Sequence, residues 1–390
     1  MDLFQKCQDF TIVKETKEAG LYPYFHALQS GQDTVVTMEG HRTIMIGSNN
    51  YLGLTSDPRV IEAAVEATNK YGSGCSGSRF LNGTLDLHLE LEKQLAEFLH
   101  KEACITFSTG FQTNLGIISA IAGRNDVIIC DKESHASIYD ACRLSFATMD
   151  RFRHNDMEDL EKVLSEVPDS KGKLIVTDGV FSMGGEICNL PKIVELAKKY
   201  GARVMVDDAH GLGVLGKSGR GTAEHFGLED EVDIMMGTFS KSLASLGGYM
   251  VAKEDVISYV KHNSRPFIFS ASIPPANAAA ALCSLNIIKS EPERVHNVIA
   301  IADYMRELMR KNNIPLRETH TPIIPVMTYD DTRTFILCRE LLKEGVYVNP
   351  VISPAVPQGQ SMIRTSYTAT HTRELMDEAM EKFVKVFANY

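Results

Sequence analysis

The sequence has 390 residues, with 50 acidic and 40 basic side chains and a formal net charge of −10. Apolar residues make up 44% and charged residues 23%, a balance that excludes a disordered, collagen-like or disulfide-scaffold chain. The negative charge argues against general binding to nucleic acid or to an anionic membrane. The length is enough for two domains with a sizeable core.

The cysteines and the N-terminus predict a protein of a reducing, cytoplasmic compartment. Eight cysteines are scattered without a CxxC pair, and His262, His320 and His371 lack metal-ligand spacing, so no metal site is expected. The first ten residues lack the features of a signal peptide. The long uncharged stretches 103–123 and 266–288 contain Ser, Asn, Gly or Pro, so we expect no integral membrane segment.

The predicted elements begin with an N-terminal arm, residues 1–50, which contains a helix and short strands. Residues 34–38 and 42–46 flank Glu39-Gly40-His41 in a pattern typical of a β-hairpin. Apolar residues recur at helical spacing in the next two segments, 59–71 and 85–99.

Short apolar runs then alternate with helical stretches up to about residue 265. We assign strands to residues 103–107, 127–130, 173–177, 203–206, 234–236 and 248–252. This alternation predicts an α/β fold with a mainly parallel sheet and helices on both faces, in a large domain over 51–275. A helix over about 276–290, ended or bent by Glu291-Pro292, opens a smaller C-terminal α+β domain, 276–390.

Polar or glycine-rich segments follow five of the predicted strands. Ligands of an open α/β sheet bind beyond the carboxyl ends of its strands, so we expect these segments to form one composite site. They are Ser108–Gln112, Asp131–His135, Asp178–Ser182, Asp207–His210 and Gly237–Lys241.

The residue types in these segments suit pyridoxal phosphate. This cofactor needs a lysine for a Schiff base and a carboxylate beside the pyridine nitrogen. It also needs a helix N-terminus for the phosphate and a flat side chain against the ring. The candidates for these roles, in that order, are Lys241, Asp207, Ser108–Phe111 and His135.

Five motifs in this order resemble those of the α-oxoamine synthases, a family of fold-type I (aspartate aminotransferase-like) pyridoxal-phosphate enzymes. The resemblance runs from about Leu21 to the C-terminus and is greatest to the bacterial serine palmitoyltransferase branch of the family. The motifs are NNYLGL at 49–54, GSGCSGSRFLNGT at 72–84, DGVFSM at 178–183, DDAHG at 207–211 and GTFSKS at 237–242.

The resemblance implies three catalytic roles. Lys241 would bind the cofactor as a Schiff base, Asp207 would pair with the pyridine nitrogen, and His135 would stack on the ring and hold the substrate carboxylate.

The resemblance also implies contacts around the cofactor and the amino acid, in a homodimer with its site at the subunit interface. His210 would contact the ring hydroxyl, and Ser272 would reach the phosphate from the partner subunit. The other cofactor-binding residues would be Gly110, Phe111, Ser182, Thr238 and Ser240. The substrate-binding residues would be Asn49, Arg364, Ser366 and Tyr367.

The implied reaction is the decarboxylative condensation of L-serine with a long-chain acyl thioester to 3-ketodihydrosphingosine, in sphingolipid biosynthesis. After the arginine strand this chain has YTATHT (residues 367–372), whereas the palmitoyltransferases usually have LMATHT. Two polar residues near Arg364 leave L-cysteate, the sulfonolipid precursor, open as the alternative substrate, ahead of glycine or alanine. Acyl chain length, the carrier (coenzyme A or acyl carrier protein) and peripheral membrane contact are left open.

Three other interpretations are weaker. An aminotransferase or a Cβ lyase would use the same fold, and a catalytically silent subunit would lack Lys241. Residues 211–218 match the phosphate-loop pattern GxxxxGK[ST], but that motif requires a helix directly after it. Gly219 and Gly221 oppose helix formation there, so we expect no nucleotide site.

Overall fold

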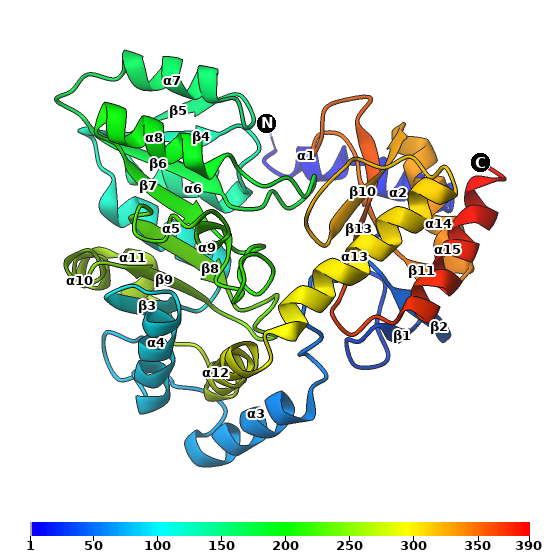
Figure 1. Ribbon diagram of the computed structural model, residues 1–390, viewed down its shortest axis with the longest axis horizontal. Helices are drawn as coiled ribbons and strands as arrows, with labels where there is room; N and C mark the ends of the chain where they lie inside the picture. The colour runs from blue at the N-terminus through cyan, green and yellow to red at the C-terminus, as the bar shows by residue number, and fades with distance from the viewer. Residues whose placement is uncertain (1) are drawn as a thin grey trace.

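Seven strands form the central sheet of the computed structural model, which describes residues 2–390 (Figure 1). Their order is β3-β9-β8-β7-β6-β4-β5, and only β9 runs antiparallel to its neighbours in this sheet. The predicted mainly parallel α/β fold is therefore confirmed. The strands are β3 (Ala103–Phe107), β4 (Asp126–Asp131), β5 (Thr148–Phe152), β6 (Gly172–Asp178), β7 (Arg203–Asp207), β8 (Ile234–Thr238) and β9 (Gly248–Ala252).

Helices cover both faces of this sheet, because successive strand residues point alternately into two hydrophobic cores. In β7, Val204 and Val206 face the first core and Met205 faces the second. The first core is covered by α3 (Pro58–Tyr71), α4 (Asp86–Phe98), α7 (Met157–Glu166), α8 (Leu190–Tyr200), α9 (Thr222–Phe226) and α12 (Pro275–Ser290). The second is covered by α5 (Gly110–Ile121), α6 (Ala136–Ser145), α10 (Glu254–Asn263) and α11 (Arg265–Ile268).

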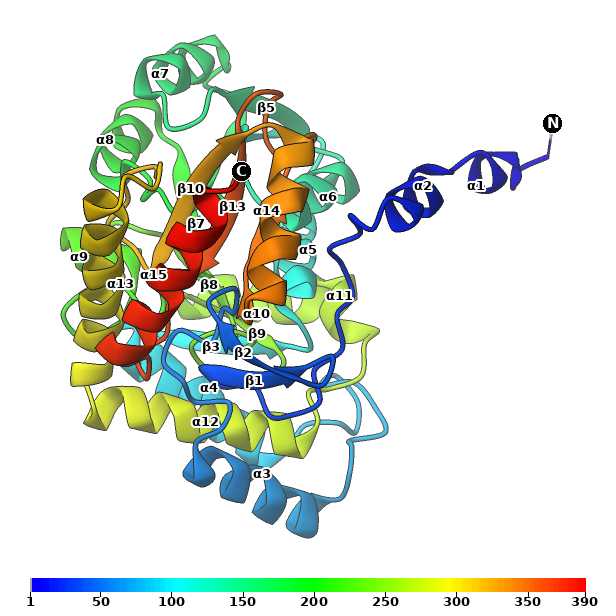
Figure 2. The same cartoon turned by 90° about the vertical axis from the view of Figure 1, so that its right-hand side faces the viewer.

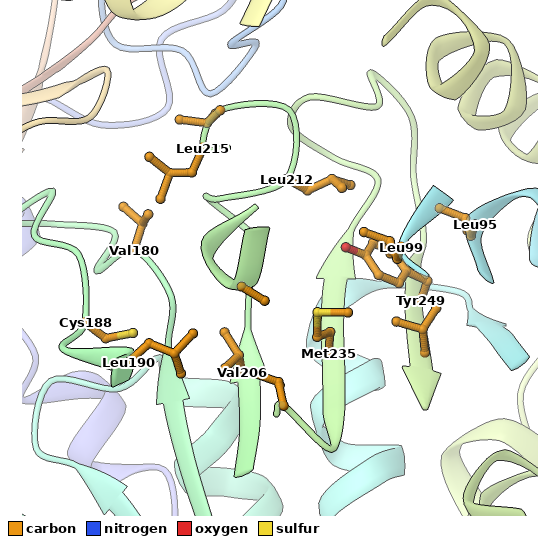
Figure 3. Packing of buried hydrophobic residues seen from close by; sticks show 14 of the residues in the cluster. Leu95, Leu99, Val180, Cys188, Leu190, Val206, Leu212, Leu215, Met235 and Tyr249 are labelled. Carbon is orange, nitrogen blue, oxygen red and sulfur yellow. The ribbon is translucent and has the colours of Figure 1, made fainter. Parts of the chain in front are cut away.

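Packing in the first core fixes the positions of the strands that lead into the candidate site. Figure 3 shows Val206, Met235 and Tyr249 on three neighbouring strands, with Leu212 and Leu215 from the loop after β7 packed nearby. All five side chains are almost completely buried. Since dense packing tolerates little displacement, the carboxyl ends of β7 and β8 are rigid supports for the loops that follow them.

Two three-stranded sheets form the smaller part of the molecule. One has the antiparallel order β10-β13-β12, and in the other β2 pairs antiparallel with β1 and parallel with β11. The strands are β1 (Val35–Met38), β2 (His41–Met45), β10 (Ile323–Tyr329), β11 (Val346–Tyr347), β12 (Asn349–Val351) and β13 (Ser361–Ser366). Three helices complete it: α13 (Glu293–Lys311), α14 (Asp331–Lys343) and α15 (Arg373–Phe387).

The predicted hairpin is present as β1 and β2, but it packs with distant parts of the chain. Ile44 and Ile46 lie in the same hydrophobic core as α13, α14 and α15. The domain boundaries drawn from the sequence remain a prediction. Before the hairpin, α1 (Gln5–Gln8) and α2 (Ile12–Glu18) extend away from the rest of the molecule (Figure 2), and all of their residues are partly or fully exposed.

The sequence did not predict β5. Its sequence, TMDRF, has two charged residues, and only Phe152 is buried, because the strand lies at the edge of the sheet. The other predicted strands are present to within one or two residues, and α12 ends just before Glu291-Pro292 as expected. Among residues 2–390, none of the helices combines the length and the apolar character that a bilayer crossing needs.

Candidate active site

A cavity of about 250 Å³ lies at the carboxyl ends of β6, β7 and β8, beside the N-terminal ends of α5 and α6. The five predicted strand-end segments were expected to meet at this edge, and all five contribute residues to the cavity wall. Eight of the predicted site residues line it: Gly110, Phe111, His135, Asp207, His210, Thr238, Ser240 and Lys241.

Lys241 supplies a reactive amine. It follows β8 in a tight loop, in which the amide of Ala244 donates to the carbonyl of Lys241 at 3.0 Å. Burial lowers the pKa of Lys241 to about 8; the charge of Asp207 opposes this shift, and that of Arg364 adds to it. The neutral, nucleophilic form of this amine is therefore far more available near neutral pH than that of an ordinary lysine.

Two carboxyl groups, Asp178 and Asp207, lie side by side, because β6 and β7 end in register. Asp207 accepts hydrogen bonds from Asn114 Nδ2 at 2.7 Å and from the amide of Ala209 at 3.1 Å. Burial, followed by the charge of Asp207, raises the pKa of Asp178 well above its ordinary value. This favours a protonated Asp178 and a single carboxylate charge at this edge of the sheet.

His135 lies at the start of α6, where its ring caps the helix. Its Nδ1 lies 2.7 Å from the hydroxyl of Ser137 and accepts from the Ser137 amide at 3.3 Å, and the His135 amide donates to Asp178 at 3.2 Å. Burial is the largest cause that lowers the pKa of His135; Lys241 lowers it further, and Asp207 opposes. The site therefore favours a neutral ring. Phe111 meets this ring edge to face, 6.3 Å away.

The N-terminus of α5 and the loop after β8 together form an anion-binding end of the cavity. Thr109 caps the helix by accepting from the Gln112 amide at 3.1 Å. The first amides of a helix have no partner within it and attract anions. The hydroxyls of Thr238 and Ser240 lie 3.0 Å apart beside them. A Cβ at Gly110 would come within 2.7 Å of Thr238 Cβ, so only glycine fits there without displacing the loop.

Arg364, on β13, approaches the cavity from the smaller part of the molecule. Its Nε donates to the carbonyl of Ser182 at 2.5 Å, and its Nη2 donates to Asn49 Oδ1 at 2.9 Å and to the Tyr51 hydroxyl at 3.3 Å. Only 5% of Arg364 is exposed, yet among residues 2–390 no carboxylate forms an ion pair with it. A buried cation without a counter-ion is costly, so this guanidinium is prepared for an anionic ligand.

Tyr51 joins Arg364 to His210. The Tyr51 hydroxyl lies 2.7 Å from His210 Nδ1 and is fully buried. Burial, and next the charges of Lys241 and Arg364, lower the pKa of His210 well below its ordinary value. His210 is therefore a neutral hydrogen-bonding group at physiological pH.

Six predicted residues lie outside the cavity wall: Asn49, Ser182, Ser272, Arg364, Ser366 and Tyr367. Ser182 contributes its carbonyl to Arg364, and the Ser366 hydroxyl donates to the Ser48 carbonyl at 2.6 Å and lies 3.4 Å from Arg364 Nη1. Ser272 donates to the carbonyl of Gly77 at 3.2 Å within its own chain.

Tyr367 requires a correction. It was expected near the amino acid, but it is fully buried in the core formed by α13, α14 and α15, with its hydroxyl 3.0 Å from Thr365 Oγ1. Side chains alternate along β13, so Arg364 and Ser366 share the face toward the site, whereas Thr365 and Tyr367 face the opposite way. The sequence prediction ignored this alternation.

Four polar residues of the site were not singled out from the sequence. Tyr51 and Asp178 stand within quoted motifs, and Asp178 ends a strand. Asn114 and Ser137 lie inside α5 and α6 and are completely buried in the structure, which no pattern in the sequence indicated.

The loop that resembles a phosphate loop has its amides occupied by a side chain of the protein itself. The amides of Ser218 and Arg220 donate to the carboxylate of Glu224 at 3.0 and 2.9 Å. The next helix, α9, begins only at Thr222. Neither feature suits a nucleotide phosphate. Within residues 2–390 there is also no group of three or more His, Cys, Asp or Glu that could hold a metal ion.

The fold and this site define a class of protein. Residues 42–383 match the sequence profile of aminotransferase class I and II, and the chain belongs to this family.

Comparison with individual relatives narrows the class of enzyme further. The chain is 54% identical over 385 residues to a serine palmitoyltransferase from Sphingobacterium spiritivorum, covering 99% of this chain and 96% of the relative. It is 43% identical over 375 residues to an 8-amino-7-oxononanoate synthase from Thermoanaerobacter pseudethanolicus, covering 96% and 95%. The solved structure of Sphingomonas wittichii serine palmitoyltransferase is similar with a TM-score of 0.97 and 38% identity, covering 100% of this chain and 99% of that one. A serine palmitoyltransferase solved with PLP is similar to the same degree.

Proposed function

We propose that this chain is a pyridoxal-phosphate-dependent acyltransferase that condenses L-serine with a long-chain acyl thioester. The products are CO₂, a free thiol and 3-ketodihydrosphingosine, which places the enzyme in sphingolipid biosynthesis. The observation that carries the proposal is the Lys241 amine, with its lowered pKa, in one cavity with Asp207 and His135. The 54% identity to a serine palmitoyltransferase supports the choice of reaction.

The residues of the cavity fit pyridoxal phosphate. Lys241 would hold its aldehyde carbon covalently, and Asp207 would keep its pyridine nitrogen protonated. The first turn of α5, with Thr238 and Ser240, would hold the phosphate. His135 would cover the ring, and the neutral His210 would contact its hydroxyl. When bound, the cofactor withdraws electrons from the Cα atom of the amino acid.

The chain's own groups would handle the proton and the carboxylate. Lys241, once displaced by the substrate amine, becomes a free base that removes the Cα proton and later returns one. His135 and Arg364 would hold the serine carboxylate, which fixes the bond that breaks at Cα. Arg364 Nη1 is the best placed donor, because its one hydrogen bond within the chain, to Ser366, is long at 3.4 Å.

The structure of β13 bears on the choice between L-serine and L-cysteate. The polar residues after the arginine strand left L-cysteate open as the second candidate, but Tyr367 is buried in the core of the smaller part and its hydroxyl lies within hydrogen-bond distance of Thr365. It cannot donate to a sulfonate in the cavity. This supports L-serine, with L-cysteate as the second candidate.

A second copy of the chain would complete the site, and this part of the proposal concerns the homodimer. Phe269 and Leu81 are 79% and 77% exposed, and their loops are neighbours, since Ser78 and Ala271 form a bridge. Phe111 and Leu246 at the cavity are also substantially exposed. Exposed apolar groups of this size are typical of an interface. Ser272, in the same loop as Phe269, would then reach the partner's phosphate site. We place the protein in the cytoplasm.

One assay separates the candidate substrates. The purified chain, loaded with pyridoxal phosphate, is incubated with palmitoyl-coenzyme A and, in parallel, L-serine, L-cysteate, glycine or L-alanine, each labelled at the carboxyl carbon. We expect thiol and labelled CO₂ in equal amounts, fastest with L-serine. Faster release with L-cysteate would overturn the choice of amino acid. Keto-acid formation without thiol release would replace the condensation by transamination.

A further inference from the structure

A continuous string of hydrogen bonds runs from Asp207 to His135 behind the cavity. Asn114 Nδ2 donates to Asp207 Oδ2 at 2.7 Å and to Ser137 Oγ at 2.8 Å. Ser137 Oγ in turn lies 2.7 Å from His135 Nδ1. Asn114 and Ser137 are completely buried, so water does not compete for these groups.

The charge at one end sets the direction of every bond in this string. A carboxylate only accepts hydrogen bonds, so Asn114 must turn its NH₂ group toward Asp207. The second hydrogen of that NH₂ goes to Ser137 Oγ. Ser137 then has one hydrogen left, and His135 Nδ1 is the acceptor within reach.

A second bond supports the same assignment for the ring. The backbone amide of Ser137 also points at His135 Nδ1, at 3.3 Å, and an amide can only donate. Two donors therefore converge on Nδ1, which leaves no place for a proton there. The remaining proton of a neutral ring must sit on Nε2, which forms no hydrogen bond with any of residues 2–390, on a side chain that lines the cavity.

We infer that Asn114 and Ser137 are positioning residues that fix His135 as a neutral ring with its proton on Nε2, ready to donate to an anionic group of the substrate. The identification of that group as the serine carboxylate rests on the proposed function. The protonation state of the ring is inferred from the hydrogen bonds alone and is independent of the proposed function.

Four other titratable groups lie around His135 in the cavity. Asp178 and Asp207 come from β6 and β7, Lys241 from the loop after β8, and His210 from the loop after β7. Asp207 favours a protonated ring, whereas Lys241 opposes it. Removal of the Ser137 hydroxyl leaves all four groups in place, so any change in the titration of His135 in Ser137→Ala reports on that hydroxyl.

The test reads the ring directly by nuclear magnetic resonance of the full-length chain with ¹⁵N-labelled histidine, with and without pyridoxal phosphate. The His135 signals are assigned by their loss in His135→Gln. In the wild type we expect an unprotonated Nδ1 and a protonated Nε2 at neutral pH. A proton on Nδ1 would overturn the inference, and because this spectrum is recorded on the wild-type chain it does not depend on whether the Ser137 variants fold.

Three variants test the role of the string. In Ser137→Ala the ring should take up its second proton at higher pH than in the wild type, because a donor to Nδ1 is lost. Ser137→Thr, which keeps the hydroxyl, should restore the wild-type behaviour. Ser145→Ala is the matched control, since Ser145 is also buried on α6 and its hydroxyl donates to the Cys142 carbonyl at 2.7 Å.

Kinetics of the loaded enzyme give a second reading. In Ser137→Ala the KM for L-serine should rise about fivefold, the equivalent of one neutral hydrogen bond, with a smaller change in kcat. An unchanged His135 titration in Ser137→Ala would overturn the positioning role. The nuclear magnetic resonance result is independent of turnover, so the inference and the proposed function fail separately.

Discussion

Replacement of Arg364 by lysine tests how the chain recognises its amino acid. Arg364→Lys keeps the positive charge but replaces a planar fork by a single ammonium. In the structure the guanidinium is held by the Ser182 carbonyl and by Asn49, whereas Nη1 has only a long contact, 3.4 Å, to the Ser366 hydroxyl. A lysine ammonium cannot keep the hydrogen bonds to Ser182 and Asn49 and also reach the same carboxylate oxygens.

The expected loss follows from the bonds that disappear. One hydrogen bond between charged groups contributes about 1.5–3 kcal/mol, which corresponds to roughly tenfold to 150-fold weaker binding. The dissociation constant for L-serine is measured by titrating the visible absorbance of the cofactor-loaded chain. Arg306→Lys is the control, because Arg306 is similarly buried but already has a partner for its charge, Asp303 at 2.6 Å, and donates to the Thr321 carbonyl at 2.8 Å.

The two arginine variants should affect different properties of the protein. Arg306→Lys should lower the melting temperature and leave the affinity for L-serine unchanged, whereas Arg364→Lys should weaken binding by at least tenfold. An affinity within twofold of the wild type in Arg364→Lys would refute the assignment of the buried guanidinium to the substrate carboxylate.

Three further predictions concern the cofactor and residues 211–218, the loop that resembles a phosphate loop. Because the pKa of Lys241 is about 8 and only the neutral amine is nucleophilic, cofactor uptake by the cofactor-free chain should accelerate with pH and level off above about 8; a continued rise toward the ordinary lysine value of 10.5 would contradict the burial argument. Gly110→Ala should weaken cofactor binding roughly fivefold to 150-fold in equilibrium dialysis, since its Cβ would displace Thr238, and unchanged binding would speak against the close approach of α5. Glu224→Gln should lower the free energy of unfolding in urea by about 1–3 kcal/mol without creating ATP binding, and ATP binding in the variant would contradict our interpretation of residues 211–218.

Much of the architecture was predictable from local patterns. Buried parallel strands are apolar runs of fixed length, and the polar segments after them have to meet at one edge of the sheet. This is why the sequence alone places Asp207 and Lys241 together. The edge strand β5 escaped prediction because its exposed residues carry no such apolar pattern.

The parts that could not be predicted depend on which way a side chain faces. Tyr367 is adjacent to the site in sequence but lies on the wrong face of β13. Asn114 and Ser137 are inside helices, and their contact with Asp207 and His135 arises only when α5 and α6 pack beside β7. Spacing along the chain specifies neither the orientation nor the partner of a side chain, so the sequence did not reveal the roles of these residues.

The most direct test of the account is to locate the cofactor on the chain. The purified protein is loaded with pyridoxal phosphate, reduced with borohydride, digested with trypsin and analysed by mass spectrometry. We predict the phosphopyridoxyl mass on one peptide, residues 221–253, where the modified Lys241 blocks cleavage. Label on a different lysine, or no label on a folded protein, would contradict the central claim.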